Sequence, residues 1–114
     1  MRDLIQQIVG EKLGAVTFVS DYYQFQFDGP YFNVWTPVTV LSEKGRAASG
    51  DDQFRNLVCG QIGKVVQGTD VRPDEFIELT FVDNSRLFFS LLQSDYPGPE
   101  AVLYTGLDGQ WDVV

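Results

Sequence analysis

The residues of this chain that could do chemistry are mainly carboxylates, since histidine is absent and cysteine occurs once. Without an imidazole, the chain has no Ser-His-Asp or Cys-His hydrolase machinery and no histidine-ligated zinc site. The single Cys59 can form neither an intramolecular disulfide nor an all-cysteine zinc site. No lysine or arginine adjoins Cys59 to activate the thiol, so we interpret it as a small buried hydrophobic residue.

The largest group of chemically able residues is acidic. The chain carries 16 Asp and Glu against 8 Lys and Arg, which gives a formal charge of -8. Residues 50–114 hold 11 of the acids and residues 1–49 hold 5. Four acids stand close together in the sequence, namely Asp70, Asp74, Glu75 and Glu78. We predict that these four form the electrostatic rim of a surface for a basic protein partner. The alternative is a solvated face that keeps the chain in solution.

The same acids do not predict a metal centre. A calcium loop of the EF-hand type needs acids at alternate positions, a central glycine and a closing glutamate. The run from Asp70 to Glu75 has neither that rhythm nor that glycine. Two carboxylates can also catalyse glycoside hydrolysis, but among 16 acids some close pair arises by chance. We therefore predict no metal and no cofactor, and keep a small carboxylate enzyme as a third hypothesis.

Aromatic residues are the second group that could contact a partner. They are concentrated in residues 22–35, where apolar and polar side chains alternate as they do in β-strands. Phe25, Phe27 and Phe32 fall on one face of such strands. Side chains of the opposite parity point outward, which predicts that Tyr22, Tyr31 and Trp35 are exposed. Tyrosine and tryptophan dominate the energetics of protein interfaces, so we predict these three residues as partner anchors. The alternative is that both faces of this hairpin are covered, as in a barrel.

Other patterns are incomplete. Ser42 and Lys44 are the one close serine–lysine pair, and their glycine-containing loop offers no buried lysine. The segment Gly60-Gln61-Ile62-Gly63-Lys64 lacks the spacing of a phosphate-binding loop. The negative charge disfavours nucleic acid and anionic membranes as partners. The sequence shows no apolar run as long as a membrane span and no signal-peptide pattern near Met1, so we expect a cytoplasmic protein.

The hydrophobic pattern predicts two short helices and a set of strands. Apolar stripes predict one helix before Gly10 and another before Gly60. Alternation and apolar runs predict strands near residues 13–19, 23–27, 31–40, 62–67, 76–82, 86–92, 101–104 and 111–113. Turn pairs such as Asp28-Gly29 supply the chemistry of tight antiparallel hairpins. We therefore predict an α+β domain, mainly antiparallel β-sheet with two short helices.

The two halves of the chain echo each other. A shift of 49 positions places Ile5 on Phe54, Gly14 on Gly63 and Val16 on Val65 without a gap. Each half then runs from a helix to a strand and a hairpin, which indicates a duplicated unit. We predict a single domain over 1–114, with half-repeats 1–41 and 52–93, a linker over 42–51 and a C-terminal β extension over 94–114 that has no counterpart in the first half.

An acidic, histidine-free α+β domain with an acid-rich second half resembles, in general character, the small immunity proteins that bacteria encode beside polymorphic or contact-dependent toxins. The resemblance implies a cytoplasmic protein that binds one toxin domain, often a basic nuclease. Our first hypothesis is therefore a non-enzymatic binding protein with the acidic residues and aromatic anchors as its contacts. The second is a homo-oligomeric structural or assembly protein, for example a homodimer, in which strand edges and outward aromatics pair with a second copy.

Overall fold

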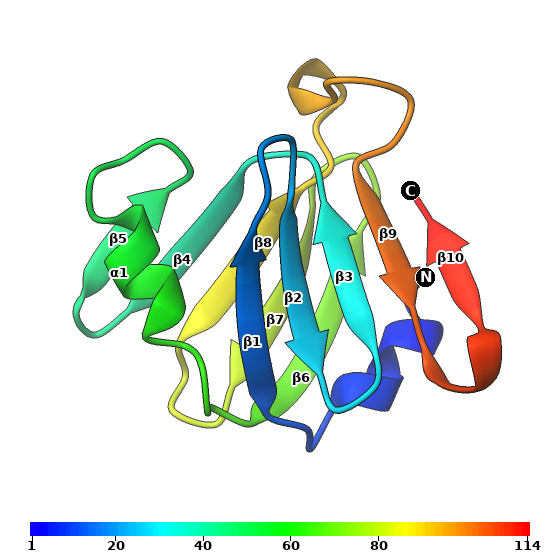
Figure 1. Ribbon diagram of the computed structural model, residues 1–114, viewed down its shortest axis with the longest axis horizontal. Helices are drawn as coiled ribbons and strands as arrows, with labels where there is room; N and C mark the ends of the chain where they lie inside the picture. Colours follow the sequence, from blue (N-terminus) through cyan, green and yellow to red (C-terminus); the bar gives the residue numbers. More distant parts are fainter.

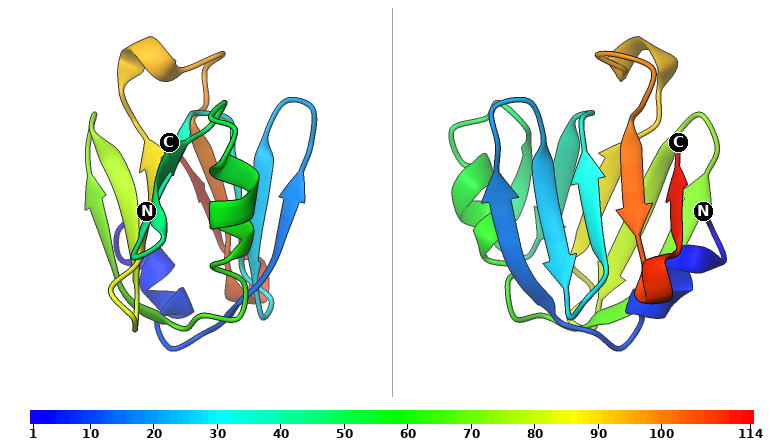
Figure 2. Two further views of the ribbon diagram at one scale, coloured as in Figure 1. Left: turned by 90° about the vertical axis from the view of Figure 1, so that its left-hand side faces the viewer. Right: turned by 45° about the vertical axis from the view of Figure 1, so that its right-hand side comes forward.

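The chain folds into two antiparallel five-stranded sheets that pack face to face, as the computed structural model of residues 1–114 shows in Figure 1. The front sheet has the order β1 (Leu13–Phe18), β2 (Tyr23–Phe27), β3 (Tyr31–Val34), β9 (Val102–Thr105) and β10 (Trp111–Val113). The back sheet has the order β5 (Gly45–Ala48), β4 (Val38–Ser42), β8 (Arg86–Ser90), β7 (Phe76–Phe81) and β6 (Val66–Arg72). Seen from the side in Figure 2, the two sheets form the two layers of a sandwich.

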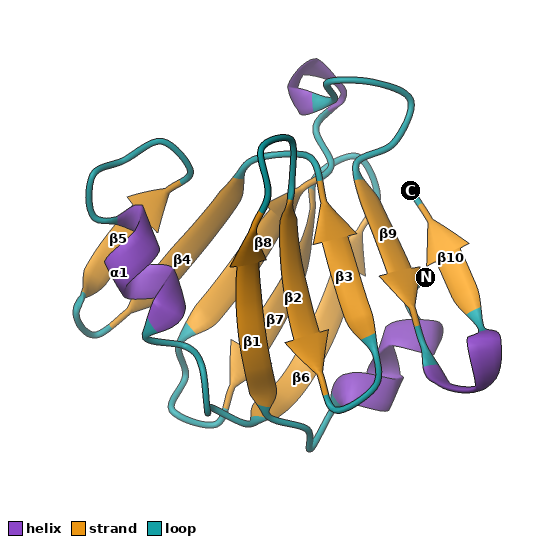
Figure 3. Ribbon diagram, in the orientation of Figure 1, coloured by secondary structure: helices purple, strands orange, loops and turns teal.

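Helical structure is confined to the ends and one side of the sandwich, as the colouring of Figure 3 makes clear. One α-helix, α1 (Phe54–Cys59), lies beside β4 and β5. The 3-10 helix η1 (Leu4–Ile8) covers the lower end of the sandwich with two buried isoleucines. The single-turn 3-10 helices are η2 (Gln93–Asp95) and η3 (Leu107–Gly109).

The core is built by the alternation of the strands. In β7, Ile77, Leu79 and Phe81 are buried, while the residues between them are partly exposed. A cluster of 23 buried hydrophobic residues fills the space between the sheets. Its centre is aromatic, since the Phe32 ring lies 5.3 Å from that of Phe89 in the opposite sheet. These contacts join the two layers, because β3 and β8 belong to different sheets.

The predicted class is confirmed at the level of a mainly antiparallel β domain, and several boundaries differ from the sequence prediction. The predicted strand 31–40 is divided, because Trp35–Pro37 cross from the front sheet to the back sheet. The strand predicted from residue 62 begins at Val66, because residues 61–63 form turns and Ile62 is exposed. The first predicted helix is of the 3-10 type. Cys59 is exposed, so its interpretation as a buried residue is wrong.

The two crossovers give the sheets a matching strand order. The hairpin β4–β5 follows β3 in the chain but lies beside β8 in the back sheet. The hairpin β9–β10 follows β8 but lies beside β3 in the front sheet. The segment 94–114, for which the sequence suggests no counterpart, therefore holds a hairpin placed as β4–β5 is. The predicted linker 42–51 contains β5, because its residues pair with β4.

The start of each half makes the same contacts across the molecule. The Gly10 N–H donates to the Val66 carbonyl at 2.9 Å, and the Gly63 N–H donates to the Leu13 carbonyl at 2.8 Å. Gly10 has φ +89° and Gly63 has φ +94°. Gly10 thus occupies the place in the first half that Gly63 occupies in the second, whereas the gapless echo in the sequence puts Gly14 there.

Both glycines should resist substitution for a backbone reason. A Cβ at Gly10 or Gly63 meets no atom within 4 Å, so the cost of alanine is the strain of a positive φ. We expect Gly10→Ala and Gly63→Ala each to lower the free energy of unfolding by about 1 kcal/mol in urea denaturation. Gly68→Ala is the control, because its Cβ also has open space and its φ lies outside the positive range. Equal losses at all three positions would contradict this explanation.

Candidate functional site

The predicted acidic rim lies on the outer face of the back sheet and on its β6–β7 turn at the upper end of the sandwich, and two of its four acids form ion pairs. Asp70 forms an ion pair with Arg72 at 3.3 Å. Glu78 forms one with Arg86 at 3.5 Å. Exposed pairs of this kind add little to stability, but they remove the excess negative charge that a basic partner would meet. The acids of β6 and β7 therefore do not present an open anionic surface.

The other two predicted acids lie at the turn between β6 and β7. Asp74 has φ +63° and accepts a long hydrogen bond of 3.4 Å from the Gln93 side chain. Glu75 lines a hollow of about 440 Å³ on the outer face of the back sheet, where Phe76, Phe88 and Arg46 are among its walls. The four predicted acids are thus distributed over a mixed surface of arginines and apolar groups.

The structure brings together two of the three predicted aromatic anchors. Tyr22 and Trp35 lie at the upper end of the sandwich with their ring centroids 5.4 Å apart. Tyr31 begins β3 at the opposite end of the front sheet, where its neighbour across the strands is Gln26. Both Tyr22 and Trp35 are partly exposed. Trp35, supported by Tyr22, is therefore the centre of a candidate site, and Tyr31 belongs to a different surface.

A cleft of about 460 Å³ opens beside Trp35. Its walls are Asp21, Trp35, Pro97, Gly98, Pro99 and Glu100. Asp21 comes from the β1–β2 turn, and the proline-rich segment from the crossover between β8 and β9, which rises above the sandwich in Figure 1. Loops held at the end of a rigid sandwich are a common position for binding sites.

The position of Trp35 is fixed by the two crossovers. The Trp35 N–H donates to the Ala101 carbonyl at 2.8 Å, and the Ser90 N–H donates to the Pro37 carbonyl at 3.0 Å. The adjacent Thr36 hydroxyl is buried and donates to the Ser90 carbonyl at 2.6 Å. These bonds join the first crossover to the ends of the second, so the backbone under the indole is anchored on both sides.

The second crossover is much longer than the first. Residues 35–37 suffice to pass from β3 to β4, whereas residues 91–101 pass from β8 to β9. The added length contains Pro97, Gly98 and Pro99, which form the wall of the cleft opposite Trp35. The cleft therefore exists because one crossover carries a segment that the matching crossover lacks.

The cleft is acidic. Asp21 and Glu100 are both exposed, and neither forms an ion pair with a lysine, an arginine or the N-terminus. Their side chains also accept no hydrogen bond from within the chain, in contrast to Asp70 and Glu78. Two unpaired carboxylates and an indole in the wall of one cleft favour a cationic group, because an aromatic ring and acids can both attract it.

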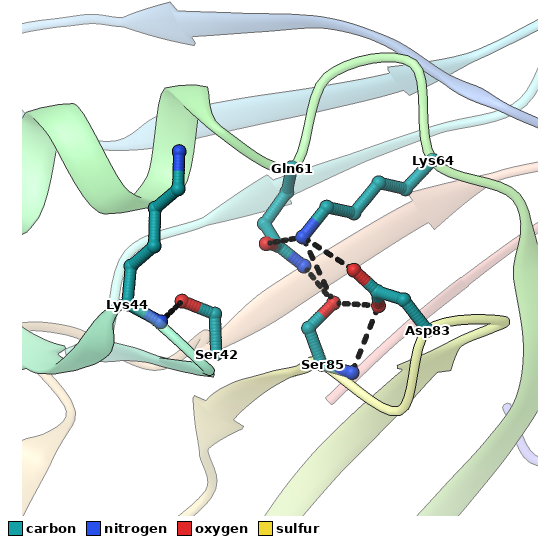
Figure 4. A network of polar contacts seen from close by, with 6 residues as sticks. All are labelled: Ser42, Lys44, Gln61, Lys64, Asp83 and Ser85. Atoms are coloured by element: carbon teal, nitrogen blue, oxygen red, sulfur yellow. Dashed lines mark hydrogen bonds and ion pairs between the residues drawn. The ribbon is translucent and has the colours of Figure 1, made fainter.

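A polar network near Ser42 and Lys44 is the strongest alternative for a catalytic site, and it is drawn in Figure 4. The Lys64 ammonium lies 2.8 Å from the Asp83 carboxylate and 3.3 Å from the Ser85 hydroxyl. The Gln61 side chain donates to the Ser85 hydroxyl at 2.7 Å and accepts from Lys64 at 2.8 Å. The Ser85 hydroxyl in turn donates to Asp83.

This network does not prepare a nucleophile. A serine–lysine catalyst needs a neutral lysine next to an accessible hydroxyl. Ser85 is only 4% exposed, and the Lys64 ammonium is engaged in an ion pair with Asp83. Ser42 accepts a bond from the Lys44 backbone N–H at 3.2 Å, and the Lys44 ammonium points away from it in Figure 4. The network's hydrogen bonds and ion pair instead connect the turn after α1 to the β7–β8 turn.

Low pH should weaken this polar network and so lower the free energy of unfolding. Hydrogen bonds from Lys64 and Ser85 lower the pKa of Asp83 from 3.8 to about 2. The stabilisation is therefore complete above about pH 4 and is lost as the pH falls toward 2. We expect it to contribute about 1 kcal/mol, because solvent screens the half-exposed carboxylate.

Urea denaturation between pH 5 and pH 2 checks this expectation, with Asp83→Asn as the matched variant. The variant should lack that part of the acid sensitivity. The Met1 ammonium, at 2.5 Å, lowers the pKa of Asp112. Protonation of Asp112 should therefore leave the variant with a smaller loss of stability as the pH falls. An identical pH dependence in the variant and the parent would contradict the assignment to Asp83.

No three cysteine or acidic side chains come together in a way that could hold a metal ion. None of the helices combines the length and the apolar character that a bilayer crossing requires. Comparison of the chain with protein-family models, with curated proteins and with solved structures finds no match.

The sequence analysis named Trp35, which lines this cleft, and Tyr22, which packs beside it, but it did not name Asp21, Glu100 or the proline-rich wall. Asp21 stands alone between Ser20 and Tyr22, and nothing local distinguishes it from the other acids. The available signal was the run Pro97-Gly98-Pro99-Glu100, since two prolines around a glycine stiffen a loop and an acid follows them. Only the fold brings this run opposite the β1–β2 turn.

Proposed function

We propose that this protein is a non-enzymatic binding protein that receives a cationic segment of a protein partner in the Trp35 cleft. The observation that carries the proposal is the pair of unneutralised carboxylates, Asp21 and Glu100, beside a supported indole. An arginine or lysine side chain can lie over the indole face while its charged end meets the acids.

The wall of the cleft supports this proposal. Pro97 and Pro99 restrict the backbone of the loop, which reduces the conformational entropy lost when a ligand is bound. The tilted contact of Tyr22 with Trp35 holds the indole from its side. A cleft that is already formed binds more tightly than one that must be ordered by its ligand.

Net charge supports a basic partner at longer range. The formal charge of -8 attracts a cationic protein before contact and raises its association rate, most strongly at low salt. In its most specific form, the proposal is an immunity protein that neutralises a basic toxin domain in the cytoplasm. The Trp35 cleft then replaces the predicted acidic rim as the main anchor of the complex.

The experiment that tests this function is capture of a partner from a lysate of the source organism on the immobilised protein, followed by mass spectrometry. We expect one basic protein in stoichiometric amount, released by raised salt and by an added arginine-rich peptide. Recovery of the chain alone, or of a partner that the peptide does not displace, would contradict the cleft as the binding site.

We also infer that the chain arose from a duplicated unit of one helix, three strands and a hairpin. The matching strand orders of the two sheets and the reciprocal bonds at Gly10 and Gly63 support this inference. In this view residues 91–101 are an addition to the second unit. The binding cleft then arose by an insertion in the second repeat unit, and the rest of the sandwich supports it.

A further inference from the structure

The outer face of the front sheet is a second surface without an assigned role. Residues in register across its five strands form two outward rows. The first row is Ala15, Gln26, Tyr31, Thr105 and Trp111. The second row passes through the neighbouring pair Gln24 and Asn33. In Figure 1 this face is turned toward the viewer.

This face carries no charged side chain, although the protein has a formal charge of -8. The outward residues of all five strands are polar and neutral or apolar. The back sheet differs, because its outer face holds Arg46, Arg72 and Arg86 together with Asp70 and Glu78. The two sheets have matching strand orders, but only the front sheet has an outer face without charged side chains.

Two aromatic side chains stand at one end of this face. Trp111 is 65% exposed, which is high for the largest side chain in proteins. Tyr31 is partly exposed and lies in the same row, with Thr105 between them. Two strand spacings separate the backbone positions of Tyr31 and Trp111 by about 10 Å. This distance matches the repeat of a disaccharide in an extended, β-linked sugar chain.

Hydrogen-bonding groups continue the surface beside the rings. The Gln24 amide donates to Asn33 at 2.9 Å, and Gln26 donates to Gln24, so the three amides form a chain across two strands. The hydroxyls of Tyr31 and Thr105 belong to the neighbouring row of the same face. The surface therefore offers amides and hydroxyls, a combination that can donate to and accept from the hydroxyls of a ligand.

We propose that this face binds a neutral, extended, β-linked polysaccharide. The apolar faces of alternate sugar rings would lie on Trp111 and Tyr31, and their hydroxyls would meet Gln24, Gln26 and Asn33. None of the hollows of the structure is lined by these residues, so the ligand must be one that lies across an open surface. A neutral sugar chain also suits this face, because the face has no charged side chain that could attract a charged ligand.

A protein partner fits this face less well. The centres of protein interfaces are closely packed and apolar, with aromatic anchors surrounded by a polar rim. Here the centre consists of amides, and the aromatic residues stand toward one edge. A second copy of the chain would also bring its own net charge of -8 to the contact.

The test is binding to soluble oligosaccharides from cellulose, xylan, mannan and chitin, measured by titration calorimetry on the intact protein. We expect saturable binding to at least one of them, with an affinity that changes little when salt is raised. Trp111→Ala should weaken it at least about tenfold, and Gln24→Ala should weaken it by a smaller factor. Phe88→Ala, on the outer face of the back sheet, is the control and should leave the affinity unchanged.

Three results would overturn the proposal. The first is no binding to any of the four sugars. The second is binding that Trp111→Ala does not weaken. The third is a dimer in sedimentation that Trp111→Ala converts to a monomer, since a second copy would then be the occupant. Because Trp111 is exposed, its replacement should not disturb folding, and circular dichroism verifies this. These outcomes are independent of the Trp35 cleft, where the control variant Trp35→Ala should leave sugar binding intact.

Discussion

The double variant Asp21→Lys with Glu100→Lys should bind the cationic partner about thirtyfold more weakly than the parent protein. Each carboxylate is exposed and unpaired, so an attractive contact is replaced by a repulsive one at two places in the cleft. Together the two reversals should cost about 2 kcal/mol of binding free energy. Most of the loss should appear in the association rate at low salt, because attraction at a distance is reversed as well.

The matched control is Asp3→Lys with Glu43→Lys. It changes the net charge by the same amount, and both acids are exposed, unpaired and outside the cleft. Surface plasmon resonance on both variants separates local contact from overall charge. Equal losses in the two variants would mean that net charge, and not the Trp35 cleft, recognises the partner.

Phe89→Ala should lower the free energy of unfolding by about 3–5 kcal/mol. Phe89 is fully buried, and its ring lies 5.0 Å from that of Phe25 and 5.3 Å from that of Phe32, both in the opposite sheet. Its removal leaves a cavity where the two layers meet. Since small domains have only about 5–15 kcal/mol of stability, this variant should unfold at much lower urea concentrations.

Phe88→Ala tests whether position, not residue type, causes this loss. Phe88 is the next residue in β8, but it points outward and packs mainly on Phe76 at 5.3 Å. We expect a loss of about 1 kcal/mol, since partial burial and one edge-to-face contact are removed. A loss at Phe88 as large as that at Phe89 would contradict the assigned faces of the back sheet.

The strands were predictable where one face is buried and the other is not. Residues 23–27 and 111–113 form strands with the predicted bounds, because alternation of side chains and the turns beside them are local signals. The same alternation predicted that Phe25 and Phe32 point inward, and both are buried. Local pattern therefore determined much of the strand content and of the core.

The arrangement of the strands was not predictable in the same way. The run from Tyr31 to Val40 looks like one strand, yet Trp35–Pro37 carry the chain to the other sheet. That crossover is fixed by bonds to Ser90 and Ala101, which are distant in the sequence. A single sequence contains no local sign of such contacts.

The candidate site was predictable only in part for the same reason. The aromatic residues were identified by type and parity, and Trp35 was found in this way. The acids Asp70 and Glu78 were chosen because they are close in sequence, but Arg72 on the same strand pairs with Asp70, and Arg86 on the neighbouring strand pairs with Glu78. Asp21 and Glu100 come from opposite ends of the chain, and only the fold brings both to the walls of one cleft.

The most direct test of the cleft uses Trp35 as its own reporter. Trp111→Phe leaves Trp35 as the single tryptophan, because the chain has two. Titration of this variant with a short arginine-rich peptide should change the tryptophan emission saturably and weaken as salt is raised. The change should be lost when Asp21→Asn and Glu100→Gln are added. No change in emission, or an equal change without the two carboxylates, would contradict the claim that the Trp35 cleft binds a cationic partner.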